Sequence, residues 1–457
     1  MCSHMLKRKA YDMLLAWKCR DHKPLLVKGQ RQVGKTFIIE RFGRDNYENV
    51  VFVNFVENES IKDVFDSDLD TDSILVALSM YLPDARFVPG NTLIVFDEIQ
   101  DCPRARTSLK FFSIDGRFDV IATGSLLDVD INGKDSKNAP IPVGYEEHLT
   151  MYSLDFEEFL WARGIGDNVI SHVRDRLSKK EPVGRAYYDR FYRLFKEFMI
   201  VGGMPQAVQT FIDESSYRSA GTIIDSLVEA AKADMNRYND SVDAGKIVSC
   251  FNSIPSQLSG SNKKFMYSRI DGKGSRKSGE MYSGSLGWIV NAGYCNPCRR
   301  LSGLDRPLMS KEIADQFKAY MSDTGMLTHM YGEDTMRAIY SDDLSYNLGA
   351  IAENVVAECL MKGGYVPRYY SKNKGKDRME LDFVVDLGSE LAVLEVKSGK
   401  DREYPSLSKV SDHFSVDRRI MFEKADTYVS EDGVEHYPLF AVAFLESLEA
   451  PWDGPEF

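Results

Sequence analysis

The stretch Gly29-Gln30-Arg31-Gln32-Val33-Gly34-Lys35-Thr36 decides the fold of the first part of this chain. It follows the apolar run Leu25-Leu26-Val27, precedes a helical run at 37–42, and fits the pattern G-x-x-x-x-G-K-[ST] in full. Glycines let a backbone wrap around phosphates, whose charge is met by main-chain N–H groups and a helix N-terminus. The stretch predicts a nucleotide-binding P-loop, in which Lys35 reaches the β- and γ-phosphates and Thr36 ligates Mg²⁺.

A later apolar run, Leu93-Ile94-Val95-Phe96, ends in the two carboxylates of Asp97 and Glu98. This order is typical of a Walker B element. There, Asp97 holds Mg²⁺ through water, and Glu98 orients and partly deprotonates the attacking water. Glu98 and Lys35 are therefore the candidate catalytic residues, with ATP and Mg²⁺ as the expected ligands. An acidic pair that caps the next helix is the alternative.

Another apolar run ends in Ala122-Thr123-Gly124-Ser125. A hydroxyl at the end of a neighbouring strand could contact the γ-phosphate and report its presence. Thr123 and Ser125 are the two candidates for such a sensor. A plain turn at the end of a strand is the alternative.

Four short apolar runs alternate with helical stretches and predict an α/β fold with a parallel sheet. Their almost continuous hydrophobicity is typical of strands that are buried on both faces. They lie at residues 25–27, 50–55, 92–96 and 118–123. The polar stretch 128–140 is rich in turn-forming residues, which indicates a loop.

Composition narrows the setting of the protein. The formal net charge of −12 argues against broad, nonspecific binding of nucleic acid. Seven scattered cysteines are not a disulfide framework and favour a reducing cytoplasm. No apolar run approaches the roughly 20 residues that a membrane-spanning helix needs, and the polar N-terminus does not look like a secretory signal. We therefore expect a cytoplasmic protein without a membrane partner.

Six motifs follow one another in an order that resembles a known family. They are GQRQVGKT, LIVFDEIQDCP, VIATGSLL, LDFEEFLW, VGGMPQAV and YMSDTGML. Together they are similar to bacterial and archaeal AAA+-type ATP-binding proteins that carry a C-terminal segment like a restriction endonuclease. The resemblance implies a P-loop NTPase core at 1–165, a helical lid at 166–243, a winged-helix-like segment at 244–335 and an endonuclease-like α/β domain at 336–457.

One position departs from this resemblance. Such proteins often read P-V-G-R, whereas here Pro142-Val143-Gly144 is followed by Tyr145. An arginine that contacts the nucleotide would then be absent or come from elsewhere. Arg104, Arg106 and Arg237 are candidates within the chain, and a neighbouring subunit of a homo-oligomer is the other source.

Four residues in the last segment resemble the PD-(D/E)xK nuclease core: Glu353, Asp382, Glu395 and Lys397. Alternation along a strand places Glu395 and Lys397 on one face. Asp382 and Glu395 could hold a second Mg²⁺, or Mn²⁺, beside a scissile phosphate, while Lys397 positions the attacking water. Glu353 could complete the metal shell. Because E-V-K is a common tripeptide, a solvated strand edge without activity is the alternative.

Two basic runs could bind DNA or another polyanion despite the acidic total charge. Solvated loops are the alternative interpretation. The runs are Lys263, Lys264, Arg269, Lys273, Arg276 and Lys277, and then Lys362, Arg368, Lys372, Lys374, Lys376 and Arg378.

Three functions stay open on the sequence alone. The first is a Mg²⁺-dependent ATPase that converts ATP to ADP and phosphate and acts as a switch or remodeller, including on nucleic acid. The second is an ATP-regulated, metal-dependent nuclease that uses Asp382, Glu395 and Lys397. The third is an interaction module that binds nucleotide, turns it over slowly and does not cut nucleic acid. The change to Tyr145 fits the third function best.

Overall fold

The computed structural model describes residues 5–125, 142–237, 241–260, 263–270, 278–343, 345–372, 378–399 and 404–449. The loop expected at 128–140 lies outside these ranges. The chain divides into two compact units. We call Lys7–Ser153 with Asn291–Gly293 the N-terminal unit, and Met1–Leu6, Leu154–Val290 and Tyr294–Phe457 the C-terminal unit.

The N-terminal unit contains a five-stranded sheet in the order β2-β3-β4-β1-β5, and every neighbouring pair is parallel. This confirms the predicted parallel α/β core. The sequence did not indicate β5, because its residues alternate between half-buried and exposed at the edge of the sheet instead of forming an apolar run. The strands are β1 (Leu25–Lys28), β2 (Asn49–Asn54), β3 (Thr92–Asp97), β4 (Asp119–Gly124) and β5 (Glu147–Thr150).

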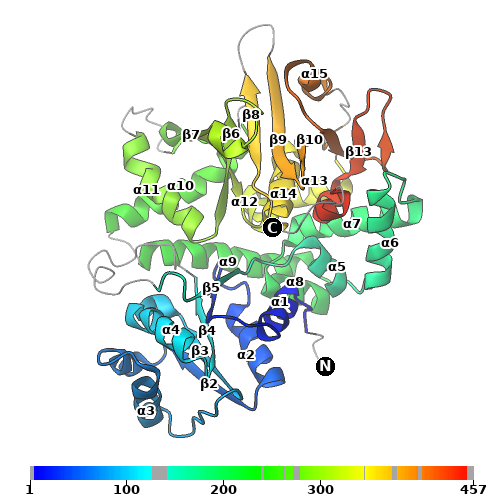
Figure 1. Ribbon diagram of the computed structural model, residues 1–457. Helices are drawn as coiled ribbons and strands as arrows, with labels where there is room; N and C mark the ends of the chain where they lie inside the picture. Colours follow the sequence, from blue (N-terminus) through cyan, green and yellow to red (C-terminus); the bar gives the residue numbers. More distant parts are fainter. Residues whose placement is uncertain are drawn as a thin grey trace. The chain divides into compact units, whose positions relative to one another are not determined.

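Helices cover both faces of this sheet, with α1 and α2 on one side and α3 and α4 on the other (Figure 1). Beneath α3 and α4, the ring of Phe96 packs 5.5 Å from Phe65 and 5.9 Å from Phe112, edge to face. Fully burying one such side chain stabilises the fold by about 1.5–3 kcal/mol. The helices are α1 (Lys9–Lys18), α2 (Lys35–Asn46), α3 (Thr71–Tyr81) and α4 (Pro103–Asp115), with the short η1 (Glu59–Phe65) before α3.

The C-terminal unit begins with helices. The first helix, α5, starts at a capping box, in which the Asp155 carboxylate accepts from the Glu158 N–H (2.8 Å) and the Glu158 carboxylate accepts from the Asp155 N–H (3.1 Å). The helices in this part are α5 (Phe156–Ala162), α6 (Asp167–Ser178), α7 (Arg185–Val201), α8 (Pro205–Glu214), α9 (Tyr217–Arg237), α10 (Ser241–Leu258) and α11 (Ser278–Asn291).

An eight-stranded mixed sheet follows, in the order β12-β13-β11-β10-β9-β8-β6-β7. The antiparallel pair β6–β7 lies in this same sheet. The sheet therefore combines strands from the segment expected at 244–335 with strands from the segment expected at 336–457. The strands are β6 (Cys295–Leu301), β7 (Glu312–Met321), β8 (Arg368–Lys372), β9 (Met379–Leu387), β10 (Glu390–Val396), β11 (Arg418–Glu423), β12 (Tyr428–Val429) and β13 (Glu435–Pro438).

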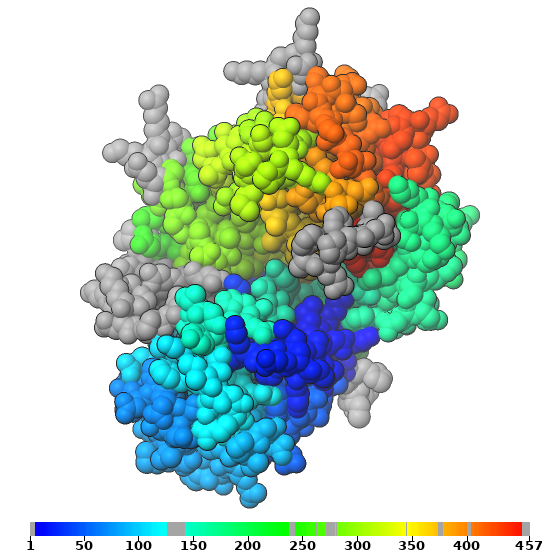
Figure 2. All heavy atoms as spheres, viewed as in Figure 1, coloured from blue at the N-terminus to red at the C-terminus, as the bar shows by residue number. Residues whose placement is uncertain are grey.

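Four further helices accompany this sheet: α12 (Thr324–Tyr331), α13 (Glu333–Ser341), α14 (Gly349–Lys362) and α15 (Pro405–His413). From α14 onward the chain runs α14-β8-β9-β10-α15-β11. Strands β8, β9 and β10 are antiparallel neighbours, and β11 lies parallel to β10. Figure 2 shows the orange-to-red end of this unit, which holds α15 and β11 to β13, as one continuous surface. Within the described ranges, no helix combines the length and apolar character needed to cross a membrane.

Candidate functional site

The P-loop joins β1 to α2 through a backbone that only certain residues can adopt. Gly34 forms the N-cap of α2 with a φ of 90°, in the left-handed region that favours glycine. A Cβ added at Gly29 would overlap the carbonyl oxygen of Met151, just beyond β5. Substitution at either glycine would therefore distort the loop at the positive end of the α2 dipole, where an anion binds most favourably.

Lys35 lies at the first position of α2 and is almost completely buried. Its ammonium group donates to the carbonyl oxygens of Gly29 (2.8 Å) and Gln30 (2.9 Å). Burial lowers the pKa of Lys35 to about 8, although Glu98 and Asp97 act in the opposite direction. A lysine whose charge is this poorly compensated gains from a nearby anion such as a phosphate.

Asp97 ends β3, and its carboxylate is surrounded by side-chain hydroxyl and amide groups. The Thr36 hydroxyl lies 3.3 Å from both carboxylate oxygens, the Asn54 amide donates at 3.0 Å, and the Thr123 hydroxyl also donates. Burial raises the pKa of Asp97, the like charge of Glu98 adds to the rise, and the hydroxyl hydrogen bonds oppose it. Thr36 and Asp97 thus present adjacent oxygen ligands of the kind that Mg²⁺ prefers.

Glu98 follows Asp97 in the left-handed backbone region, with a φ of 54°. This conformation is uncommon for a residue other than glycine, and it costs about 1–3 kcal/mol where the surroundings enforce it. Its half-buried carboxylate accepts a hydrogen bond from the amide of Gln100. Such local strain is typical of functional positions.

The two hydroxyls considered as sensors have different partners. Thr123 donates to Asp97, whereas the Ser125 hydroxyl accepts from the Arg31 guanidinium at 3.2 Å. The structure therefore brings Thr123 to the candidate metal ligand and Ser125 to the P-loop.

Two of the candidate arginines are held inside the N-terminal unit. Arg104 donates to the carbonyl oxygens of Phe65 and Ser67, and Arg106 forms an ion pair with Glu146 at 2.7 Å. The side chain of Arg237 lies outside the described part of the structure. Both guanidinium groups are therefore engaged by residues of their own unit.

Two further residues that the sequence motifs do not indicate support this site. Arg8 is buried and donates to the P-loop carbonyl of Val33 (2.9 Å) and to the carbonyl of Tyr152 (2.7 Å). Asn54 reaches Asp97 because β2 and β3 are parallel neighbours in the register Asn54 to Asp97. A polar residue at the end of an apolar run was the only local signal for Asn54, and Arg8 had none.

The four nuclease-like candidates gather in the C-terminal unit. Lys397 forms an ion pair with Glu395 at 3.1 Å, and Asp382 accepts from the Val396 N–H at 3.0 Å. Burial raises the pKa of Asp382 well above its usual range, and the carboxylates of Glu353 and Glu395 add to the rise. The second oxygen of Glu395 is buried without a hydrogen-bond partner among the described residues.

Glu353 has partners that the sequence did not suggest. Its carboxylate accepts from the Tyr320 hydroxyl (2.9 Å) and pairs with Lys318 (3.4 Å) and Lys263. Burial opposes ionisation of Glu353, but Lys318 and Lys263 outweigh it and hold its pKa below the usual range. Lysines thus pair with Glu353, the residue that was expected to complete a metal shell. No set of three or more histidine, cysteine, aspartate or glutamate side chains in the described ranges is arranged to hold a metal ion.

Part of the second basic run is also engaged internally. Lys362 pairs with Glu358 at 2.6 Å, and Arg368 pairs with Glu312 at 2.7 Å. Both basic side chains are buried or nearly so. These two residues therefore do not contribute to a surface for a polyanion.

The fold and the site of the N-terminal unit are typical of a P-loop domain that binds a nucleotide. Residues 21–160 match the family model described as an AAA domain. Two further models, both described as domains of unknown function (DUF8612 and DUF4143), match residues 192–337 and 348–442. Neither of these descriptions supports a nuclease-like domain.

Comparison with solved structures gives distant likenesses. A Walker-type ATPase of Pyrococcus abyssi is 11% identical, with a TM-score of 0.44, over 72% of this chain and 96% of its own. The AMPPCP-bound DnaA of Aquifex aeolicus is 12% identical, with a TM-score of 0.26, over 63% of this chain and 89% of its own. Comparison with curated proteins found no match.

Proposed function

We propose that this protein is a Mg²⁺-dependent ATPase that works as a nucleotide-driven switch. The observation that carries the proposal is the meeting of Lys35, Thr36 and Asp97 beside Glu98 at the ends of β1 and β3. This set supplies a phosphate-binding cation, two oxygen ligands and a carboxylate base. ATP turnover would change the state of the helices at 166–243 and of the segment 244–335.

Each residue has a distinct task in this proposal. Lys35 and the P-loop N–H groups of residues 29–34 bind the β- and γ-phosphates. Thr36 and Asp97 would hold Mg²⁺, which would neutralise charge on the phosphate oxygens. Glu98 accepts a proton from water as the water oxygen attacks the γ-phosphorus and the bond to the β-phosphate oxygen breaks. The left-handed backbone at Glu98 supports this assignment, because such strain is typical of functional positions.

The test compares wild type, Glu98→Gln and Glu59→Gln, the last being a matched change at an acid whose side chain is 90% exposed. Glu98→Gln should keep ATP affinity but lower turnover by about 10²- to 10⁴-fold, the usual contribution of a general base. Glu59→Gln should turn over ATP like wild type. Equal turnover in Glu98→Gln and wild type would refute the proposal and favour the slow interaction module.

A second candidate function is metal-dependent cleavage of nucleic acid at Asp382, Glu395 and Lys397. An oxygen of Glu395 that is buried without a hydrogen-bond partner among the described residues, on a side chain that also pairs with Lys397, favours it. Asp382 and Glu395 would hold Mg²⁺ or Mn²⁺, and Lys397 would position water. Incubation of DNA and RNA with either metal should then give cleavage that Lys397→Ala abolishes and Lys409→Ala, at an exposed position, preserves. Absence of cleavage in wild type would refute this function.

A further inference from the structure

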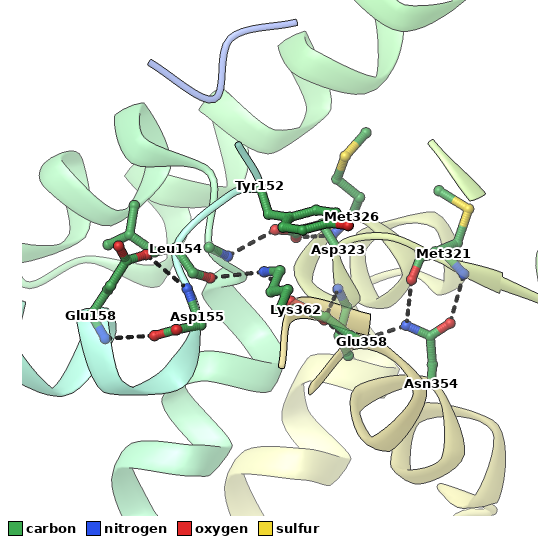
Figure 3. Close-up of polar contacts among 12 residues, drawn as sticks. Tyr152, Leu154, Asp155, Glu158, Met321, Asp323, Met326, Asn354, Glu358 and Lys362 are labelled. Atoms are coloured by element: carbon green, nitrogen blue, oxygen red, sulfur yellow. Dashed lines mark hydrogen bonds and ion pairs between the residues drawn. The ribbon is translucent and has the colours of Figure 1, made fainter. Parts of the chain in front are cut away.

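Three motifs that the nucleotide site leaves unused meet inside the C-terminal unit (Figure 3). They are the segments that contain Leu154, Gly202-Gly203 and Asp323. The Leu154 N–H donates to the Gly203 carbonyl at 2.7 Å, and the Gly203 N–H donates to the Asp323 carboxylate at 2.9 Å. A Cβ added at Gly203 would overlap the Leu154 backbone, so this close approach requires glycine.

Helix α14 completes the junction with two buried charges. Lys362 donates to the Leu154 carbonyl at 2.8 Å and to Glu358 at 2.6 Å, as Figure 3 shows. The other Glu358 oxygen accepts from the N–H and the hydroxyl of Thr324, at the start of α12. Both polar backbone groups of Leu154 are therefore held, the N–H by Gly203 and the carbonyl by Lys362.

The charges of this junction suggest a role beyond stability. Lys362 and Glu358 have almost no exposed side-chain surface. Burial lowers the pKa of Lys362, but Glu358 and Asp323 outweigh it, so the pKa is raised and the lysine stays charged. Apolar residues of the same volume often stabilise a core as well as a buried ion pair does. What the pair adds is a fixed position for one backbone carbonyl, that of Leu154.

Leu154 stands just past the point where the chain leaves the N-terminal unit, whose last residue before it is Ser153. Within that unit, the Met151 N–H donates to the carbonyl of Lys28 at 2.7 Å, directly before the P-loop. The carbonyl of Tyr152 accepts from Arg8, which also holds the P-loop carbonyl of Val33. The segment 151–154 is therefore hydrogen-bonded next to the P-loop through Met151 and to α14 through Leu154.

We infer that residues 151–154 couple ATP binding at the P-loop to α14, with Lys362 as the positioning residue that grips the coupling segment. The inference rests on the proposed ATP binding. When the P-loop binds Mg·ATP, Met151 moves together with the loop. The hydrogen bond from Lys362 to the Leu154 carbonyl then moves α14 as well. The same helix carries Glu353 nine positions earlier, about 13 Å away at 1.5 Å per residue. A movement of α14 therefore also changes the position of Glu353 relative to Asp382 and Glu395.

Hydrogen exchange measured by mass spectrometry tests this coupling. The full-length Glu98→Gln variant holds Mg·ATP, and its α14 peptides should exchange about threefold more slowly, or more slowly still, with nucleotide than without. Adding Lys362→Met should leave ATP affinity within about twofold, because Lys362 is held by Leu154 and Glu358 and is not one of the proposed nucleotide-binding residues, and should abolish the α14 response. Lys409→Met, at an exposed site, serves as the matched control and should preserve the response.

A milder variant guards against loss of folding. Thr324→Val removes one hydrogen bond to Glu358 and should reduce the α14 response without abolishing it. An unchanged response in both Lys362→Met and Thr324→Val would overturn the role of the clamp. Tight ATP binding with no response of α14 in Glu98→Gln would overturn the coupling and leave the ATPase proposal intact. Failure to bind ATP at all would refute the proposed function itself.

Discussion

Lys35 in the N-terminal unit and Lys318 in the C-terminal unit are both almost wholly buried, yet their environments act in opposite directions. Lys35 donates mainly to backbone carbonyls, and burial lowers its pKa to about 8. Burial also acts to lower the pKa of Lys318, but Glu353 and Asp382 outweigh it and raise the pKa above the usual value. One buried cation is poorly compensated, and the other is surrounded by carboxylates.

This difference separates a buried cation that lacks a full countercharge in its own chain from one that has it. A protein keeps a buried, poorly compensated charge where a ligand later supplies the countercharge, so perturbed lysines mark functional sites. A lysine compensated by its own chain has no need of a ligand, and its removal leaves the carboxylates unpaired. We therefore expect substitution of Lys35 to impair function and substitution of Lys318 to impair folding.

The largest expected effect is the loss of stability in Lys318→Met. The change leaves Glu353 without one of its cations in a buried site, and breaking a buried pair in this way costs about 3–5 kcal/mol. Urea denaturation should show this loss in the free energy of unfolding, while Lys409→Met at an exposed site changes it by less than about 0.5 kcal/mol. Equal stability of the two variants would mean that Lys318 is not a structural charge.

Next in size is the effect of Lys35→Met on ATP affinity. The ammonium group is expected to contact phosphate, and a hydrogen bond to a charged group is worth about 1.5–3 kcal/mol, so affinity should fall by about 10- to 160-fold. The unfolding free energy of the nucleotide-free protein should not fall, because the change removes a poorly compensated buried charge. Calorimetric titration and urea denaturation measure the two quantities. If Lys35→Met is clearly destabilised but binds ATP normally, Lys35 stabilises the fold and does not bind the nucleotide.

A smaller effect follows from the pH dependence of ATP binding. Without nucleotide, Lys35 loses its proton as the pH rises through about 8, whereas bound phosphates favour the charged form. Binding therefore takes up a proton, and affinity should fall about tenfold between pH 7 and pH 9. The stability of the nucleotide-free protein changes in the opposite direction. Because the pKa of Lys35 is lower in the folded than in the unfolded state, the free energy of unfolding rises as the pH increases from about 8 toward the unfolded pKa.

Titration calorimetry at several pH values, in buffers of different ionisation enthalpy, measures both the affinity and the proton uptake. The Lys35→Met variant is the control, and its weak affinity should hardly change over the same interval. A steep fall in both proteins would assign the effect to another group.

The sequence predicted those features that depend on neighbouring residues and missed those that depend on distant ones. The P-loop residues and the pair of Asp97 and Glu98 are consecutive, so their spacing carries the signal. The contact from Arg8 to Tyr152 spans 144 positions, and that from Lys318 to Glu353 spans 35. Such pairs form only when strands and helices pack, and nothing in the sequence around either residue identifies its partner.

The parallel sheet of the N-terminal unit was predictable because four of its strands are apolar on both faces. The polar edge strand β5 was not, although it brings Met151 next to the P-loop. In the C-terminal unit, acidic residues and the E-x-K spacing marked the cluster. Nothing local indicated that Lys318 and Lys263 would pair with Glu353, and that pairing changes Glu353 from an expected metal ligand into a partner of lysines.

The smallest expected effect distinguishes the two hydroxyls at the end of β4. Thr123→Val keeps the side-chain shape but removes the hydrogen bond to Asp97, whose buried carboxylate then becomes harder to ionise and a weaker Mg²⁺ ligand. One such hydrogen bond is worth about 0.5–1.5 kcal/mol, so the Mg²⁺ concentration for half-maximal turnover should rise by about two- to tenfold. Ser125→Ala removes an acceptor of Arg31 and should leave the Mg²⁺ dependence unchanged. Steady-state ATP turnover at varied Mg²⁺ measures both variants, and a larger shift in Ser125→Ala would show that Ser125, and not Thr123, supports Mg²⁺ binding.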